Sequence, residues 1–327
     1  MRMARVVIMA ALLMVLAACS ATAGDQQPSS APATTATWSY TNGFGHTVTF
    51  PQAPKVIVAD AYSAASLWPY GIRPAGVFGY GLEKDAAPGS LGDADVTQMK
   101  VVGTGGDLDI EALAALQPDL IIGYGDSDTK GTSWTWWDKG VAAKVDKIAP
   151  FVGVNFADRP VTEVIGEYES LAKALGGDVG SESATHAKSD FEAASKAVEE
   201  TMAAKPKLSA IALNADGSSV YVGGPKLAQI ALLNSLGLRT AGPKGGDNDY
   251  WGELSWEKVP DYPADVVLAY TGSTETFANS PVYQKLPAVK AGQVVGWDDK
   301  MPFTYAQYAS WLTEVNTTLA KAKVVTT

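Results

Sequence analysis

The same pattern of residues occurs twice in this chain of 327 residues, at a constant offset of 146 positions. The copies are residues 109–124, DIEALAALQPDLIIGY, and residues 255–270, SWEKVPDYPADVVLAY. In each, a helix-capping residue stands two places before a Glu, and eight residues later an Asp opens a short apolar run that ends in Tyr. Helix-to-strand units of this kind build parallel sheets, and ligands usually bind at the carboxyl edges of such sheets. Any α/β protein can contain one such unit, so it is the repetition of both Glu and strand that predicts a duplicated α/β lobe.

The N-terminus has the features of an exported lipoprotein. Arg2 and Arg5 precede an apolar stretch at 6–16, and the tetrad LAAC that ends at Cys19 resembles the bacterial lipoprotein box. Cys19 is the only cysteine, which excludes an internal disulfide, and its thiol stands where a diacylglyceryl group would be attached; the alternative is a thiol in a cleaved peptide. We predict a signal peptide at 1–19 and, from its Ser, Ala, Thr, Pro and Gln, a flexible tether at 20–36.

The remaining chain contains no run of 18 apolar residues, so we expect a soluble body held on the extracytoplasmic face of the membrane by its lipid. Loss of the two signal-peptide arginines leaves 23 basic against 35 acidic side chains. This acidic balance argues against a nucleic acid partner. We expect a monomer.

The folded part is predicted to consist of an N-terminal α/β lobe at 37–180, a linking helix at 181–205 and a C-terminal α/β lobe at 206–327. It begins at Trp38, where Asn42-Gly43 predicts a hairpin turn before a strand at 47–50. Further strands are expected at 56–59, 75–78, 120–123, 151–154, 208–213, 220–222, 266–270 and 294–296, and helices at 160–175, 227–236 and 305–318.

The long helix is expected from Ser181 to Ala204, with Phe191, Ala194, Val198 and Met202 on one face. About 24 residues at about 1.5 Å each span some 36 Å, a length that suits a strut between two lobes.

These residues resemble the substrate-binding lipoproteins of bacterial ABC importers for ferric siderophores, haem and cobalamin. The resemblance covers nearly everything after Trp38 and rests on PKVIV at 54–58, GIRPAGV at 71–77, the first copy of the repeat, and LPAVKAGQVV at 286–295. It implies two Rossmann-like lobes joined by one long backbone helix, a ligand cleft between them, little closure on binding and no enzymatic activity.

In this family a glutamate from each lobe docks into basic pockets of the membrane permease, and by position these glutamates look like Glu111 and Glu257. Two exposed carboxylates set far apart would orient the cleft over the channel and speed encounter. The alternative is that each merely favours a helix N-terminus, which is worth a few tenths of a kcal/mol.

Aromatic residues follow many of the predicted strands, where the cleft would lie. Their rings give stiff contact area with a polar handle, as a bulky, partly apolar iron chelate requires. The predicted ligand-binding residues are Tyr62, Tyr80, Tyr124, Trp134, Trp136, Trp137 and Arg159 in the first lobe, and Tyr221, Trp251, Tyr270, Trp297 and Tyr305 in the second. We assign Trp38, Trp68 and Trp311 to the core.

The scarcity of arginine narrows the choice of ligand. Only Arg73, Arg159 and Arg239 remain after the signal peptide, and Arg73 and Arg239 stand in predicted surface turns. A ferric tris-catecholate carries about three negative charges and needs several cationic donors. Some hydroxamate binders of the family carry an Arg just before the first signature helix, where this chain has Gly103-Thr104-Gly105-Gly106. We predict a neutral or cationic ferric trihydroxamate, similar to a ferrioxamine, with cobalamin or haem as the alternative.

Other chemistry has little support. His46 and His186 are the only histidines, too few for direct capture of Zn or Mn, and we expect neither a cofactor nor a metal bound directly by the protein. The segment 126–137 imitates the start of a calcium loop but has Trp137 where Glu is required. A secreted glycoside hydrolase remains an alternative, although the repeat places Glu111 and Glu257 on separate lobes and not across one substrate.

Overall fold

The computed structural model describes residues 37–84, 86, 90–245 and 249–326. The predicted signal peptide with Cys19 and the predicted tether at 20–36 lie outside the described residues. Within these ranges no helix combines the length and the apolar character needed to cross a membrane.

A β-hairpin opens the described chain. Strand β1 (Trp38–Thr41) pairs antiparallel with β2 (Thr47–Phe50). The Oδ1 atom of Asn42 accepts hydrogen bonds from the backbone N–H groups of Phe44, at 3.1 Å, and His46, at 2.9 Å. The side chain of Asn42 therefore fixes the turn, and the hairpin predicted from Asn42-Gly43 is confirmed.

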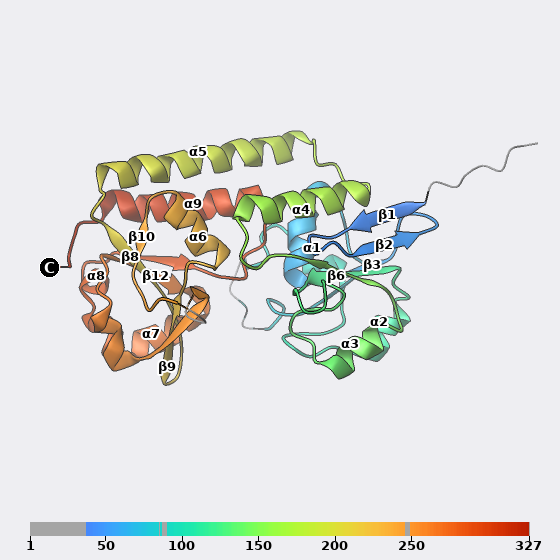
Figure 1. Ribbon diagram of the computed structural model, residues 1–327, viewed down its shortest axis with the longest axis horizontal. Coiled ribbons are helices and arrows are strands. Elements are labelled where there is room, and N and C mark those ends of the chain that lie inside the picture. Colours follow the sequence, from blue (N-terminus) through green and yellow to red (C-terminus); the bar gives the residue numbers. More distant parts are fainter. Residues whose placement is uncertain (1–36, 85, 87–89, 246–248, 327) are drawn as a thin grey trace, which may run out of the picture. The chain divides into compact units, whose positions relative to one another are not determined.

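The first sheet is parallel throughout, with strand order β5-β4-β3-β6-β7. Figure 1 labels its strands β3 and β6. Its strands are β3 (Ile57–Asp60), β4 (Gly76–Phe78), β5 (Lys100–Val101), β6 (Leu120–Tyr124) and β7 (Phe151–Val154). Strands β3, β4, β6 and β7 are buried along their whole length, which explains why the sequence shows them as continuous apolar runs. The helices of this lobe are α1 (Ala61–Leu67), α2 (Ile110–Ala115), α3 (Lys139–Val145) and α4 (Val161–Ala174).

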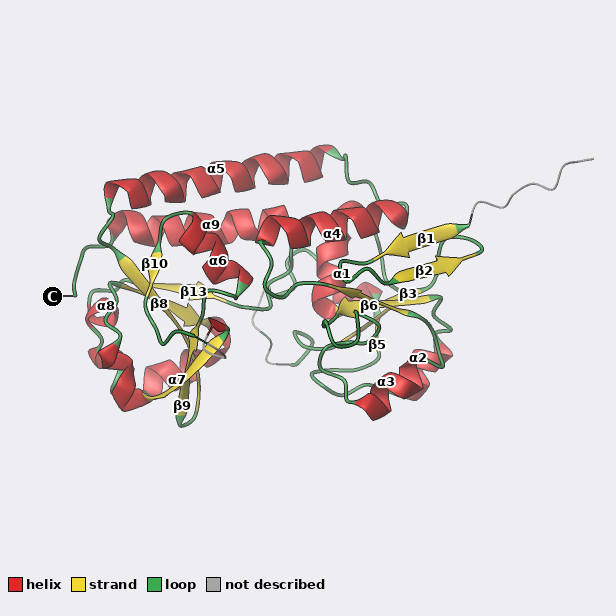
Figure 2. Ribbon diagram, in the orientation of Figure 1, coloured by secondary structure: helices red, strands yellow, loops and turns green. Residues whose placement is uncertain are grey.

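The second sheet is mixed. Strand β8 pairs parallel with β12 and β10 and antiparallel with β9, and β12 pairs parallel with β13. The strands are β8 (Ser209–Asp216), β9 (Ser219–Gly223), β10 (Arg239–Thr240), β11 (Trp251–Ser255), β12 (Val266–Tyr270) and β13 (Val294–Trp297). The helices are α6 (Ala228–Ser235), α7 (Thr274–Asn279), α8 (Pro287–Lys290) and α9 (Tyr305–Lys321), and Figure 2 separates helices and strands by colour. The predicted fold class of two α/β lobes is confirmed.

Helix α5 (Glu182–Ala204) has contacts in both lobes. It packs along α9 of the second lobe (Figure 1) and also contacts the short 3₁₀ helix Trp68–Tyr70 of the first. The hydroxyl of Ser181 caps its N-terminus by accepting from the backbone N–H of Ala184 at 3.2 Å. Its buried residues are the four predicted for one face, Phe191, Ala194, Val198 and Met202.

Asp119 and Asp265, the repeated aspartates, occupy the same place in the two sheets. The Oδ2 atom of Asp119 accepts from the backbone N–H groups of Lys55 and Val56, both at 2.8 Å, beside the start of β3. The Oδ2 atom of Asp265 accepts from the backbone N–H of Ser209 at 3.0 Å, at the start of β8. Because β3 and β8 are the parallel neighbours of β6 and β12, each aspartate ties together the N-terminal ends of two paired strands.

The prediction of an α-helix in the second copy of the repeat is wrong. In the first copy Asp109 caps α2 through the backbone N–H of Ala112, at 2.9 Å. In the second copy Ser255 ends strand β11, makes no capping hydrogen bond, and precedes a 3₁₀ helix that contains Pro260. Proline lacks the N–H that an α-helix needs at this position, so the turn stays tight and short.

Phe303, in the segment between β13 and α9, connects the second lobe to the first. Its backbone N–H donates to the Oγ atom of Ser66 on α1 at 2.9 Å. Its ring is 1% exposed and lies 6.1 Å from the ring of Tyr124 and 6.5 Å from that of Tyr168. A residue of the second lobe thus completes the core of the first.

Candidate functional site

A cleft of about 460 Å³ lies between loops of the two lobes. Its side chains come from segments that follow β3, β4 and β6 in the first lobe and from the ends of β12 and β13 in the second, which is the carboxyl edge of both sheets. The first lobe contributes Tyr62, Tyr80, Glu83 and Trp136, and the second contributes Tyr270, Asp298 and Lys300. We call this hollow the cleft; four of the predicted ligand-binding residues, Tyr62, Tyr80, Trp136 and Tyr270, line it.

The first lobe lines the cleft with the rings of Tyr62, Tyr80 and Trp136, which we call the aromatic wall. Asp60 holds this wall in place. This carboxylate caps α1 by accepting from the backbone N–H of Ser63 at 2.7 Å. It also accepts from the backbone N–H of Tyr124, at 2.6 Å, and from the indole N–H of Trp134, at 3.1 Å. Burial raises the pKa of the Asp60 carboxyl to about 6, because the loss of hydration outweighs these donors.

Trp134 in turn supports the half-buried ring of Trp136. It is 2% exposed, and its ring lies edge-on to that of Trp136, with 4.9 Å between the centroids. Gly123 makes room for this arrangement, since a Cβ atom there would lie 2.8 Å from Oδ2 of Asp60 and 2.9 Å from the Trp134 ring. The cleft therefore presents Trp136 on a rigid support.

Three predicted ligand-binding residues are placed by the structure in the hydrophobic core. Tyr124, Trp134 and Trp297 are each at most 2% exposed, so their side chains shape the walls behind the cleft. The ring of Tyr124 stacks on Phe156, with 4.4 Å between the centroids. Apolar rings after a strand pack against the sheet unless a loop carries them away from it.

Four more predicted residues lie away from the cleft. The ring of Trp137 stacks on Phe78, and that of Tyr305, on α9, packs against Phe191 of α5. Tyr221, on β9, donates to Asp216, and Trp251 packs against Trp297.

Arg159, predicted in the cleft, forms an ion pair with Glu167 of α4 instead. The Glu167 carboxylate also accepts from the backbone N–H of Gly43 in the hairpin turn, at 2.8 Å, and Arg159 donates to the carbonyl oxygen of Asn155 at 2.7 Å. The guanidinium is therefore committed to joining the hairpin, α4 and the loop after β7. Arg73 and Arg239 are exposed, as predicted.

The charged residues of the cleft were missed by the sequence analysis. Glu83, Asp298 and Lys300 line it, and Nζ of Lys300 lies 2.9 Å from Oδ1 of Asp299. Burial raises the pKa of the Asp298 carboxyl, and the nearby charge of Asp299 adds to that effect. With the one lysine paired to Asp299, the cleft carries an excess of negative charge. Two adjacent acids, Asp298 and Asp299, two residues after the expected strand 294–296 were the sequence signal that could have found them.

Glu111 and Glu257 are both exposed and stand in the first turns of α2 and of the 3₁₀ helix Trp256–Asp261. Hydrogen bonds from its own backbone N–H and from Ser255 lower the pKa of Glu257. Glu257 borders an apolar hollow of about 380 Å³ in the second lobe, which shares no lining residue with the cleft.

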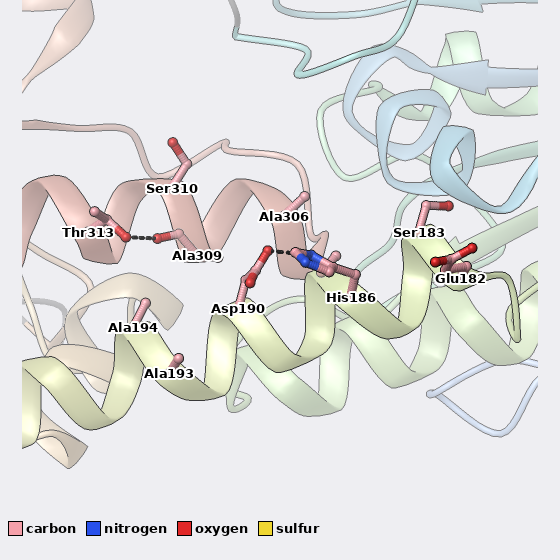
Figure 3. Close-up of a pocket in the computed structure, with 11 residues that line it drawn as sticks. Glu182, Ser183, His186, Asp190, Ala193, Ala194, Ala306, Ala309, Ser310 and Thr313 are labelled. Atoms are coloured by element: carbon pink, nitrogen blue, oxygen red, sulfur yellow. Dashed lines mark hydrogen bonds and ion pairs between the residues drawn. The ribbon is translucent and has the colours of Figure 1, made fainter.

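A wider groove of about 980 Å³ lies along α5 and α9 (Figure 3). Small and polar side chains line it, and His186 Nδ1 lies 2.8 Å from Oδ2 of Asp190 on the same helix. No Phe, Tyr or Trp lines it, and its lining does not overlap with that of the cleft. Among the described residues no three His, Cys, Asp or Glu side chains are grouped so as to hold a metal ion.

Two α/β lobes with a ligand cleft at the carboxyl edges of their sheets define a class of two-lobed binding proteins. A family model for the periplasmic binding proteins matches residues 80–301. The chain belongs to this family.

Individual relatives agree with this membership. The chain is 26% identical over 321 residues to YhfQ of Bacillus subtilis (strain 168), whose name assigns it to the ABC transporter substrate-binding lipoproteins, and the match covers 90% of each protein. It is 31% identical to DesE, a ferric-siderophore receptor protein from Streptomyces coelicolor, with a TM-score of 0.81 over 88% of this chain and all of DesE. FhuD2 of Staphylococcus aureus, solved with bound ferrioxamine B, shares the fold, with 18% identity and a TM-score of 0.58 over 82% of this chain and 99% of FhuD2.

Proposed function

We propose that this protein is an exported lipoprotein that captures a ferric siderophore, of the hydroxamate type, and delivers it to the permease of an ABC importer. The observation that carries the proposal is the cleft, in which the rings of Tyr62, Tyr80, Trp136 and Tyr270 surround a small number of charged groups. Its volume of about 460 Å³ lies in the usual range of small-molecule sites.

The charges of the cleft favour a trihydroxamate over a catecholate. A ferric trihydroxamate core is neutral, whereas a ferric tris-catecholate carries about three negative charges that require cationic partners when buried. Lys300 is the one cation that lines the cleft among the described residues, and it is paired with Asp299. Glu83 and Asp298 would repel an anionic chelate further.

The relatives support the same class of ligand. DesE is named as a ferric-siderophore receptor, and its match extends over its whole chain. Haem and cobalamin remain the alternatives within the class. His46 lies in the hairpin and His186 on the outer surface of α5, so neither histidine can ligate the metal of such a ligand in the cleft.

Two further parts of the proposal concern delivery. Glu111 and Glu257 are the residues that we propose dock on the permease, because both are exposed, one in each lobe, and outside the cleft. Cys19 is the proposed site of the lipid anchor. The assignment of YhfQ to the lipoproteins supports it.

Titration of intrinsic tryptophan fluorescence tests the capture of a chelate. A ferric trihydroxamate should quench the fluorescence saturably, since Trp136 lines the cleft. A ferric tris-catecholate, haem and cobalamin, titrated in the same way, are the competitors. Saturable quenching by the catecholate alone would overturn the hydroxamate assignment, and quenching by none of the four would overturn the proposed function.

A further inference from the structure

A second hollow, of about 220 Å³, adjoins the cleft. The two share Ser90, Thr271 and Asp298 in their walls. Beyond these residues, the second hollow is lined chiefly by Trp297, Trp311 and Glu314. We call it the side pocket. A ligand that fills the cleft can therefore extend a substituent past Asp298 into it.

The side pocket is acidic. Its charged lining residues are Asp298 and Glu314, whereas Lys300 of the cleft does not line it and is paired with Asp299. Asp298 takes part in none of the ion pairs found among the described residues. Its Oδ1 atom accepts from the backbone N–H of Lys300 at 2.8 Å, and the hydroxyl of Tyr270 also donates to the carboxylate. The Thr271 hydroxyl lies 3.5 Å from Oδ2, at the limit of a hydrogen bond. The carboxylate thus keeps capacity for a cationic donor.

The aromatic lining suits an alkyl chain that carries a positive charge. The indole N–H of Trp297 is directed to the carbonyl oxygen of Leu213, at 3.4 Å, and that of Trp311 to the carbonyl oxygen of Gly296, at 3.0 Å. With their polar atoms occupied, the two indoles, 1% and 5% exposed, form an apolar backing to the pocket that favours methylene groups. Burial raises the pKa of Asp298 in the empty protein, and a bound ammonium would favour its charged form.

We propose that the side pocket holds an alkylammonium arm of the ferric chelate bound in the cleft, with Asp298 as its counterion. The assignment rests on the proposed function and narrows it to chelates with a cationic tail. The volume corresponds to roughly seven waters at about 30 Å³ each, which a short alkyl chain with a terminal ammonium can fill. Such an arm would distinguish its chelate from neutral cyclic ones that share the same iron centre.

A matched pair of ligands tests this subsite. Ferrioxamine B is a linear trihydroxamate that ends in a primary ammonium, and its N-acetylated derivative keeps the chelate but loses the charge. Fluorescence titrations of the full protein at low salt should give a Kd for the acetylated form that is about tenfold higher, since a buried charge-assisted hydrogen bond is lost. The ratio should fall as salt is raised.

Substitutions test which residue causes the preference for the ammonium form over the acetylated form. Asp298→Asn should reduce the ratio of the two Kd values to below about twofold, mainly by weakening the ammonium form. Glu314→Lys should lower the ratio as well. Because Glu314 is exposed, this variant tests the side pocket even if Asp298→Asn disturbs folding. Glu83→Gln, on the cleft wall but outside the side pocket, should preserve the preference. Glu199→Gln, an exposed acid on α5, is the matched control for a change in net charge.

The possible outcomes separate a failure of the proposed subsite from a failure of the proposed function. Equal affinity of the wild type for the two forms overturns the subsite while leaving chelate capture intact. A preference that survives both Asp298→Asn and Glu314→Lys but disappears in Glu83→Gln places the ammonium in the cleft and also overturns it. If neither form quenches the fluorescence, the proposed function fails, and this assignment fails with it.

Discussion

Replacement of Arg159 should destabilise the protein without weakening ligand binding. Arg159 is paired with Glu167, whose side chain is 6% exposed. In Arg159→Ala this carboxylate keeps the backbone N–H groups of Gly43, at 2.8 Å, and Asn155, at 3.3 Å, but loses its cation. The substitution therefore leaves a buried negative charge with two neutral donors.

The magnitude follows from the burial of the pair. Removing one partner of a fully buried ion pair costs about 3–5 kcal/mol, because the other charge is left uncompensated. The Arg159 side chain is 22% exposed and two donors to Glu167 remain, so we expect a loss of about 2–3 kcal/mol in the free energy of unfolding. For a chain of this size, that loss lowers Tm by roughly 3–5 °C.

Urea unfolding followed by circular dichroism measures the loss, and fluorescence titration with a ferric trihydroxamate measures affinity. The double variant Arg159→Met with Glu167→Gln should recover at least half of the stability, since it removes the stranded charge and keeps an acceptor for the backbone donors. Arg239→Ala, which removes an exposed arginine, serves as the control. Unchanged stability together with a tenfold loss of affinity in Arg159→Ala would refute the reasoning and return Arg159 to the ligand site.

Four sets of substitutions test the remaining placements. Because the pKa of Asp60 is raised to about 6 in the folded protein from 3.8, the folded state takes up the proton first, so the free energy of unfolding of the wild type should rise by about 2 kcal/mol relative to that of Asp60→Asn between pH 7 and pH 4 in urea unfolding; a constant difference would contradict the role of burial. Trp136→Ala should weaken binding of the ferric chelate by about tenfold in a calorimetric titration, and an unchanged Kd would exclude contact with its ring. Charge reversal at Glu111 and Glu257 should abolish cellular uptake of the labelled chelate at unchanged affinity, whereas lowered affinity would move these residues into the ligand site. Cys19→Ser should shift the protein from the membrane fraction to the soluble fraction, and a variant that still sediments with membranes would argue against the lipid anchor.

The strands could be predicted because burial imposes a simple pattern on them. The expected strand at 151–154 is β7 to the residue, and the one at 120–123 differs from β6 only at Tyr124. The missed strands β5 and β10 have two residues each, and their sequences carry too few side chains to show any periodicity. The five-residue strand β11 was also missed, because Gly252 is its one buried residue and no apolar run marks it. Length and burial decide which elements the sequence reveals.

The cleft was harder to predict, because the same position in a repeat can face in different directions. Tyr124 and Tyr270 end equivalent strands 146 residues apart, yet Tyr124 is buried beneath Phe156 while Tyr270 lines the cleft. The difference arises from contacts distant in sequence, such as the insertion of Phe303 beside Tyr124. Arg159 was misplaced for a similar reason, since nothing in the local pattern shows that Glu167 and Gly43 converge on it. Sequence periodicity identifies the loops at the sheet edges, but it does not show which of their side chains line the cleft and which are buried in the core.

The contacts of Phe303 also limit how the cleft can respond to its ligand. The Oγ atom of Ser66 accepts from the backbone N–H of Phe303 and donates to the carbonyl oxygen of Tyr62, so the joint between the lobes is continuous with a residue of the cleft wall. Separating the lobes at this point would expose a buried phenylalanine, at about 1.5–3 kcal/mol, and break a hydrogen bond worth about 1 kcal/mol. Since Asp60 also holds the aromatic wall from behind, we expect the cleft to be largely formed before a ligand binds. Little of the binding free energy is then spent on ordering the site, so the shape and charge of the chelate determine which ligand is retained.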